Sequence, residues 1–146
     1  MSMLVDTNVL LRRLETQHPH HPDAMASVSR LLGRGEELYV TLQNLTEAWH
    51  RMTVPTNANG LGFTVSVAAT AIDQITRLLA LLPEDTLAVT REWRQLVEHY
   101  QVSGREVFDA RLAATMLVHK IDSILTFNTR DFTRYGVSVL EPKAVT

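Results

Sequence analysis

Four acidic residues occupy positions where α/β proteins place their working groups. Asp6 and Asp131 each follow a short apolar run, while Glu47 and Asp109 fall on predicted helices. Carboxylates gathered without matching basic partners repel one another and raise a pKa unless a cation neutralises them. Mg²⁺ and Mn²⁺ prefer carboxylate oxygen and water as ligands, and such sites hydrolyse phosphate esters. The acidic set therefore indicates phosphodiester cleavage.

Each of these acidic residues also has a purely structural explanation. An Asp at a strand-to-helix turn is often a helix cap, and a Glu on a helix is usually solvated. Taken singly, this explanation is favoured for Glu47 and Asp131. Asp6 and Asp109 favour function, because the residues after Asp6 can cap the next helix themselves and Asp109 lies among apolar residues.

Short apolar strands alternate with helical segments along the chain. The strands are expected at residues 3–5, 38–40, 87–89, 124–126 and 137–140. Helices are expected at residues 9–14, 23–32, 42–52, 64–82 and 90–100, and a capping box of Ser103 and Glu106 is expected to open one that ends near residue 119. This order predicts an α/β domain with a largely parallel sheet covered on both faces, whose working groups lie beyond the carboxyl ends of the strands.

Length and composition limit the possible classes of protein. The chain has 146 residues, which predicts one domain over residues 1–146, and 45% of them are hydrophobic, as in ordinary globular proteins. The absence of cysteine excludes disulfides, Cys-ligated metals and thiol nucleophiles. We find no secretory signal and no apolar stretch of the roughly 18–20 residues that cross a bilayer, so the expected location is the cytoplasm, away from membranes.

Four motifs in order along the chain resemble the PIN-domain ribonucleases, particularly toxins of the VapC type. The motifs are V-D-T-N-V-L-L at residues 5–11, N-L-T-E-A-W at 44–49, F-D-A-R-L-A-A at 108–114 and L-T-F-N-T-R-D-F at 125–132. The resemblance covers nearly the whole chain. It implies a PIN-like α/β/α sandwich with a central sheet of four to five short strands, in agreement with the strand and helix pattern.

The resemblance also implies a role for individual residues. Asp6, Glu47 and Asp109 would be catalytic acids that hold Mg²⁺ or Mn²⁺ and activate a water against a phosphodiester. Thr126 would supply a supporting hydroxyl, and Asn8 would be a polar neighbour of Asp6.

The fourth acidic position of the family differs in this sequence. Many members have an acid two residues after the threonine, where this chain has Asn128. Asn128 can coordinate a metal through its carbonyl oxygen, and Asp131 is the nearby carboxylate that could complete the metal and catalytic set. Both remain candidates for this position.

The function implied by the resemblance is a metal-dependent endoribonuclease, the toxin of a type II toxin–antitoxin pair. Its expected partners are an RNA substrate, a cognate antitoxin bound over the active-site groove, and a second copy in a homodimer that joins a larger assembly with the antitoxin. Two alternatives stay open. One is a PIN nuclease for RNA processing without an antitoxin, and the other, suggested by Asn128, is a PIN-like module that binds RNA or protein without cutting.

Arginine dominates the basic residues, with 12 Arg against 2 Lys and a formal net charge of −2. Nucleic-acid binding therefore requires a local patch rather than a general positive field. Arg suits such a patch because its planar guanidinium binds phosphate through two donors, although most surface charges only form weak pairs. Seven arginines lie near the acid-bearing turns in sequence and could form a phosphate-binding rim: Arg12, Arg13, Arg51, Arg105, Arg111, Arg130 and Arg134. The candidates for RNA binding among them are Arg12, Arg13, Arg51, Arg111 and Arg130.

The histidines give weaker signals. His18, His20 and His21 lie in a proline-broken segment without a Cys partner or a His pair at helical spacing, which favours a solvated loop over a metal site. Glu47 and His50 form one E-x-x-H pair, but di-iron bundles need two copies. His50 is therefore expected to flank the site or to be an ordinary partly buried histidine.

Overall fold

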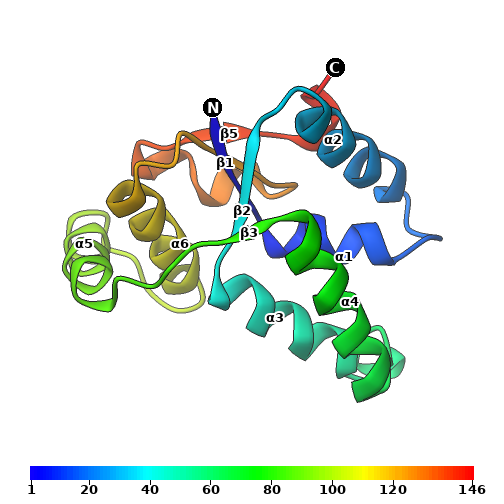
Figure 1. Ribbon diagram of the computed structural model, residues 1–146. Coiled ribbons are helices and arrows are strands. Elements are labelled where there is room, and N and C mark those ends of the chain that lie inside the picture. Colours follow the sequence, from blue (N-terminus) through cyan, green and yellow to red (C-terminus); the bar gives the residue numbers. More distant parts are fainter.

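Five parallel strands form a sheet at the centre of the protein (Figure 1). The computed structural model describes residues 1–146, the whole chain. The strands lie in the order β3-β2-β1-β4-β5. Their bounds are β1 (Ser2–Val5), β2 (Glu37–Val40), β3 (Ala80–Leu81), β4 (Ser123–Leu125) and β5 (Ser138–Leu140). The expected parallel sheet of four to five short strands is confirmed.

The strand order reverses at β1. β2 and β3 are added on one side of β1, whereas β4 and β5 are added on the other. In parallel α/β sheets, such a reversal leaves a crevice at the carboxyl ends of the strands, where ligands bind. Val5 of β1 pairs with Leu125 of β4. The next residues, Asp6 and Thr126, therefore leave the sheet beside each other.

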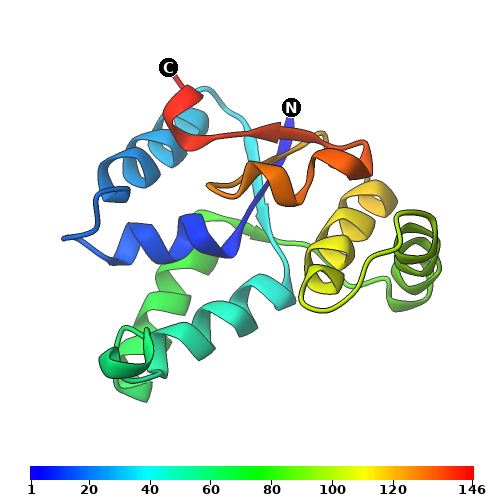
Figure 2. The same cartoon turned by 180° about the vertical axis from the view of Figure 1, so that it is seen from behind.

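Six α-helices cover the sheet, as Figure 1 and the reverse view in Figure 2 show. Helices α1, α2 and α4 pack on one face, and α6 packs on the other with α5 on its outer side. Helix α3 packs against α1 and α4. The bounds are α1 (Thr7–Leu14), α2 (His21–Gly33), α3 (Leu42–Thr53), α4 (Val65–Leu78), α5 (Thr86–His99) and α6 (Glu106–His119).

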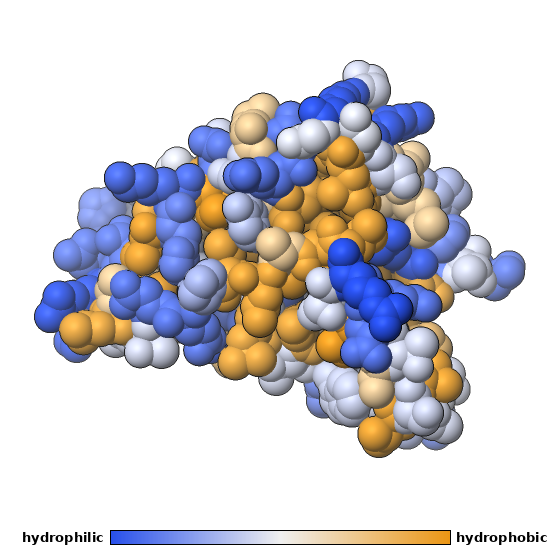
Figure 3. Space-filling model, in the orientation of Figure 1, coloured by the Kyte–Doolittle hydropathy of each residue, from blue (hydrophilic) through white to orange (hydrophobic).

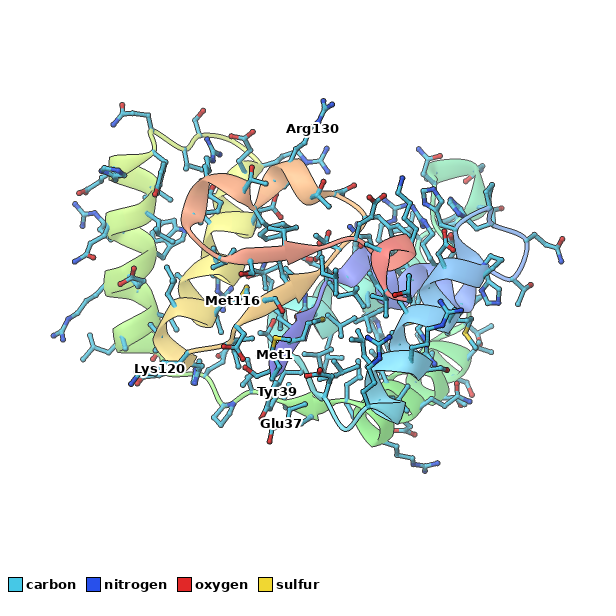
Figure 4. The ribbon with its side chains drawn as sticks, turned by 90° about the horizontal axis from the view of Figure 1, so that it is seen from above. Met1, Glu37, Tyr39, Met116, Lys120 and Arg130 are labelled. Atoms are coloured by element: carbon cyan, nitrogen blue, oxygen red, sulfur yellow. The ribbon has the colours of Figure 1, made fainter.

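The side chains of β1 alternate between the two faces of the sheet. Met3 and Val5 join the core beneath α1, α2 and α4, whereas Leu4 packs against Leu112 and Met116 of α6. Figure 4 shows Met116 between α6 and the strands. Because both faces are covered by helices, the strand sequences are continuous apolar runs rather than alternating apolar and polar residues.

The third strand differs from the sequence prediction. Residues 87–89 were expected to form a strand but lie in α5, because the side chain of Asp85 accepts the Ala88 N–H at 3.1 Å and caps the helix. The predicted helix over residues 64–82 was too long at its carboxyl end. It stops at Leu78, and the following apolar residues form β3, where Ala80 pairs with Tyr39 of β2.

Two helix starts also differ from the prediction. The capping box of Ser103 and Glu106 is absent: Arg105 precedes α6 without a side-chain cap bond. Helix α2 begins at His21, two residues earlier than expected, with Pro22 in its first turn, where the missing N–H costs nothing. Because α6 starts later than expected, at Glu106, Asp109 lies in its first turn.

One face of the protein shows apolar side chains between the α5–α6 pair and α4 (Figure 3). Strand β3 forms one edge of the sheet, and its Leu81 is 52% exposed. Leu78, at the end of α4, is also exposed. No helix is both long and apolar enough to cross a lipid bilayer.

Candidate active site

Asp6 lies at the crevice beyond β1 and caps α1. Its Oδ1 accepts the N–H of Thr7 at 2.8 Å, and its Oδ2 accepts the hydroxyl of Thr126 at 2.8 Å. The residue is only 7% exposed. Burial raises the pKa of Asp6 from 3.8 to about 6, and the two hydrogen bonds only partly offset this effect. The carboxylate is thus fixed in place and costly to ionise without a nearby cation.

Asn8 and Thr126 hold the oxygens around Asp6. The side-chain amide of Asn8 donates to Asp6 Oδ2 at 3.3 Å and to Thr126 Oγ1 at 3.2 Å, while its Oδ1 accepts the N–H of Phe127 at 3.2 Å. Thr126 Oγ1 also accepts the N–H of Asn128 at 3.0 Å. The two residues expected to support Asp6 are therefore bonded to it directly and connect the ends of β1 and β4.

Glu47 lies on α3, which begins with a reciprocal capping box. The side chain of Thr41 accepts the backbone N–H of Asn44, and the side chain of Asn44 accepts the backbone N–H of Thr41. Glu47 Oε2 accepts the hydroxyl of Thr7 at 2.8 Å, and Oε1 accepts the amide of Gln43 at 2.9 Å. Thr7 thus contacts Glu47 and, through its N–H, Asp6.

Asp109 faces the same crevice from the first turn of α6. Burial is the largest cause that raises its pKa from 3.8 to about 7, followed by the nearby charges of Asp6, Asp131 and Glu47. No hydrogen bond to the carboxylate offsets them. Asp109 is consequently the acid of this cluster with free oxygens and the strongest need for a neutralising cation.

These acids line one open groove of about 810 Å³. Asp6, Glu47 and Asp109 come from three separate elements, and Asn128 contributes from the end of β4. The complete lining is Asp6, Thr7, Asn8, Leu11, Arg12, Thr46, Glu47, His50, Arg51, Arg105, Phe108, Asp109 and Asn128. The structure therefore brings together the three acids that the sequence singled out.

Two residues were candidates for the fourth metal-binding position. Asn128 lines the groove, but Asp131 does not. Asp131 is nevertheless close enough for its charge to raise the pKa of both Asp6 and Asp109. It lies in a short 3₁₀ turn, η2 (Thr129–Asp131), and its side chain is exposed.

The chemistry of the donor set fits a hard divalent cation. Three carboxylates share the groove, and no salt bridge neutralises Asp6, Glu47 or Asp109. No three His, Asp or Glu side chains lie close enough together to ligate one ion directly. This suits Mg²⁺, which usually keeps several waters and takes only one or two protein carboxylates.

The arginines separate into two groups. Arg12, Arg51 and Arg105 line the groove beside the acids. Of the other candidates, Arg13 lies in a separate cleft with Gln74, Arg77 and Leu78, and Arg111 pairs with Glu84 at 3.1 Å. Arg130 is outside the groove lining and extends from the outer edge of the molecule (Figure 4). Only Arg12 and Arg51 of the five RNA-binding candidates thus line the groove.

The histidine segment is more ordered than the expected solvated loop. The rings of His20 and Phe127 stack at 4.7 Å between centroids, and His21 Nδ1 lies 2.8 Å from the carbonyl oxygen of Arg12. These contacts attach the start of α2 to α1 and to the end of β4. No metal cluster of histidines forms. His50 is exposed and lines the groove, as expected for a residue flanking the site.

Two residues that bond the acids, Gln43 and Thr7, were not predicted as part of the site. Gln43 lies four residues before Glu47, a spacing that places both on one helix face, and Thr7 directly follows Asp6. Arg105, one of the wider set of seven arginines, has the same spacing from Asp109 and lines the groove.

Comparisons with known proteins agree with this architecture. The model of the PIN domain family matches residues 3–137. The chain is 31% identical over 143 residues to Ribonuclease VapC24 of Mycobacterium tuberculosis, covering 92% of this chain and 91% of that protein.

Two solved structures share the fold at low sequence identity. VapBC-1 from nontypeable Haemophilus influenzae has a TM-score of 0.71 at 13% identity and covers 98% of this chain and 99% of its own. VapC20 of Mycobacterium tuberculosis, described as a sarcin-ricin loop cleaving toxin, has a TM-score of 0.66 at 20% identity and covers 93% and 96%. Together with the family match and the 31% identical relative, the groove of acids at the reversal of the sheet leads to one assignment: the chain belongs to the PIN-domain family, among proteins of the VapC type.

Proposed function

We propose that this protein is an endoribonuclease that requires Mg²⁺ or Mn²⁺, with residues 1–146 acting as one PIN domain. The observation that carries the proposal is the groove in which Asp6, Glu47 and Asp109 meet without a salt bridge to any of them, with the pKa of Asp109 raised to about 7. The ribonuclease name of the 31% identical relative supports the same activity.

One or two of the acids would hold the cation directly and the rest would hold it through its bound waters, with Asn128 or Asp131 at the fourth position. When bound, such an ion lowers the pKa of water and offsets charge on phosphoryl oxygens. Asp6 contributes a carboxylate already oriented by Thr126, so its geometry is set before substrate binds. A water, rather than the 2′ hydroxyl of the RNA, is the proposed nucleophile, and the products would carry 5′-phosphate and 3′-hydroxyl ends.

The groove arginines would bind the RNA backbone. Arg12, Arg51 and Arg105 line the same groove as the acids, and a guanidinium can contact phosphate with two parallel N–H donors. Arg12 is oriented by Glu15, with Nη1 to Oε2 at 2.8 Å, and Arg51 by the carbonyl oxygen of Asn59 at 2.6 Å. These cations give the local positive patch that the net charge of −2 makes necessary.

Cleavage of a mixed cellular RNA pool by the purified protein tests the activity. We expect discrete cuts with Mn²⁺ or Mg²⁺, no cuts with a chelator, and no cuts by Asp109→Asn. If wild type and Asp109→Asn give the same fragments, any cutting comes from contamination and a non-catalytic binding module becomes the better account. The identity of the cut RNA would separate a toxin from a processing nuclease.

We further propose that the protein is the toxin of a type II toxin–antitoxin pair that acts in the cytoplasm. The VapC name of its relative supports this, as does the likeness to a VapBC complex. The antitoxin would cover the acidic groove, and the pair would form a larger assembly. Expression of the wild type should arrest growth, whereas the Asp6→Asn variant should not. Equal growth arrest by the wild type and by Asp6→Asn would contradict a toxin mechanism based on this site.

A homodimer is part of the same proposal. The edge strand β3 and the end of α4 leave Leu81 and Leu78 exposed, and exposed apolar side chains at a sheet edge are candidates for an interaction surface. Light scattering after size-exclusion chromatography should give the mass of two chains for the wild type and of one chain for Leu81→Asp. A wild-type monomer would contradict the dimer.

A further inference from the structure

Gln43 connects the two helices that carry Glu47 and Asp109. It lies on the first turn of α3 and is only 8% exposed. Its side-chain nitrogen donates to Glu47 Oε1 at 2.9 Å and to the backbone carbonyl oxygen of Phe108 at 2.9 Å. Phe108 is the residue directly before Asp109 on α6. One amide group therefore bonds an acid of α3 and the backbone next to an acid of α6.

The orientation of this amide follows from its partners. A carboxylate oxygen and a carbonyl oxygen can only accept, so the NH₂ end of Gln43 must face both of them. Its own oxygen, Oε1, consequently points away and is buried without a hydrogen-bond partner. An unpartnered buried acceptor destabilises the fold. An apolar side chain of the same length would avoid that unsatisfied group but would remove the donor to Glu47 and to Phe108.

The contact matters most for Glu47. Each carboxylate oxygen of Glu47 has one donor, the hydroxyl of Thr7 on Oε2 and the amide of Gln43 on Oε1. Without Gln43, the Oε1 end would lose its only protein donor and the side chain could rotate. Bonds from a donor to an ionised carboxylate are among the stronger and more directional hydrogen bonds.

We infer that Gln43 is a positioning residue that sets the spacing between the carboxylates of Glu47 and Asp109 and thereby raises the affinity for the divalent cation. The inference rests on the proposed metal-dependent function. Groups that orient metal ligands from outside the coordination sphere typically change metal affinity by 10–100-fold when they are removed. Gln43 itself is buried and does not line the groove, so it acts on the cation through Glu47 and α6.

The test uses the full chain and three proteins: wild type, Gln43→Met and Gln95→Met. Methionine keeps the length of the side chain and removes the amide. Gln95 is an exposed glutamine on α5, on the outer side of α6, and serves as the matched control. Isothermal titration with Mn²⁺ gives the Kd, RNA cleavage gives kcat and KM, and thermal unfolding gives Tm.

For Gln43→Met we expect a Mn²⁺ Kd at least about tenfold weaker, a lower kcat and a KM for RNA within about twofold of the wild type. We expect little change in Tm, because two hydrogen bonds are lost while one unpartnered buried acceptor is removed. Gln95→Met should match the wild type throughout. An unchanged Mn²⁺ Kd in Gln43→Met overturns the inference, whether or not Tm falls, because a merely structural role would change only Tm. A wild type that neither binds Mn²⁺ nor cuts RNA would instead overturn the proposed function.

A measurement on the wild type provides a check that needs no substitution. In a protein labelled with ¹⁵N, the side-chain amide protons of Gln43 should be protected from exchange, and their resonances should shift as Mg²⁺ is added. The side-chain amide of Gln95 should do neither. Unprotected Gln43 amide protons that do not respond to Mg²⁺ would overturn the inference.

Discussion

Asp109→Asn should stabilise the metal-free protein while it abolishes RNA cleavage. Burial, followed by the charges of Asp6, Asp131 and Glu47, raises the pKa of Asp109 from 3.8 to about 7, so its ionised form is disfavoured in the folded state. Asparagine has nearly the same shape and no charge. The substitution removes this electrostatic cost, and no hydrogen bond to the carboxylate is lost with it.

The sign of the effect follows from the two pKa values. Asp109 is ionised above about pH 4 in the unfolded chain but only above about pH 7 in the folded protein. The stabilising effect of the protonated form is therefore complete below pH 4 and is lost as pH rises towards 7. Asp109→Asn has no such loss, so its advantage over the wild type should grow between pH 5 and pH 8.

The expected magnitude is modest. A rise in pKa from 3.8 to about 7 lowers the free energy of unfolding of the ionised protein by ~4 kcal/mol for a fully buried group. Asp109 is partly exposed, so solvent screening reduces this to about 1–2 kcal/mol. The substitution also removes a favourable carboxylate from the first turn of α6, worth roughly 0.3–1 kcal/mol. We expect a net gain of about 1 kcal/mol at pH 8.

Urea unfolding with a chelator, at pH 5 and at pH 8, measures this difference. The wild type should be less stable than Asp109→Asn at pH 8 and closer to it at pH 5. Saturating Mn²⁺ should then stabilise the wild type more than the variant, because a ligand raises the free energy of unfolding only when the folded protein binds it. A variant less stable than the wild type at pH 8, or a difference independent of pH, would refute the reasoning.

Further substitutions test other parts of the structure. Thr126→Val removes the hydroxyl that donates to Asp6. It should lower the free energy of unfolding, measured in urea, by about 1–3 kcal/mol and reduce RNA cleavage, whereas Thr126→Ser should retain the stability and the activity. Arg105→Ala should weaken binding of single-stranded RNA and reduce the salt slope by about 0.7, while Arg111→Ala, outside the groove, should change neither in a fluorescence anisotropy titration. Gly60→Ala should lower Tm, because a Cβ there would overlap a backbone carbonyl oxygen; an unchanged Tm would show that the loop relaxes freely.

The relation of Asp6 to Thr126 was predictable from sequence. Both follow short apolar runs, and parallel strands bring their carboxyl ends to one edge of the sheet. The same pattern of short apolar runs misled the prediction of a strand at residues 87–89. Their Leu-Ala-Val composition suits a strand, but the cap from Asp85 and the packing of α5 on α6 outweigh local preference.

The arginines show why the periphery of the site was harder to predict. Residues on a helix are rotated by about 100° each, so position 105 lies on the face of Asp109 and position 111 lies about 200° away. Spacing along one helix therefore separates these two arginines, but which arginines of the other elements line the groove depends on how those elements pack against one another. Likewise, the role of Gln43 depends on its side-chain rotamer and on how closely the start of α3 approaches the backbone of α6, which one sequence does not encode locally.

Analysis of the ends of the RNA fragments tests the central claim most directly. The purified protein is incubated with Mn²⁺ and an intact RNA that it is known to cut, and Asp109→Asn serves as the control. The new ends are identified by whether they need phosphatase or kinase treatment before they can be ligated. Attack by a water held in the acidic groove predicts 5′-phosphate and 3′-hydroxyl ends that are absent from the control. Ends with 2′,3′-cyclic phosphate would contradict the account, because they require attack by the 2′ hydroxyl of the RNA itself.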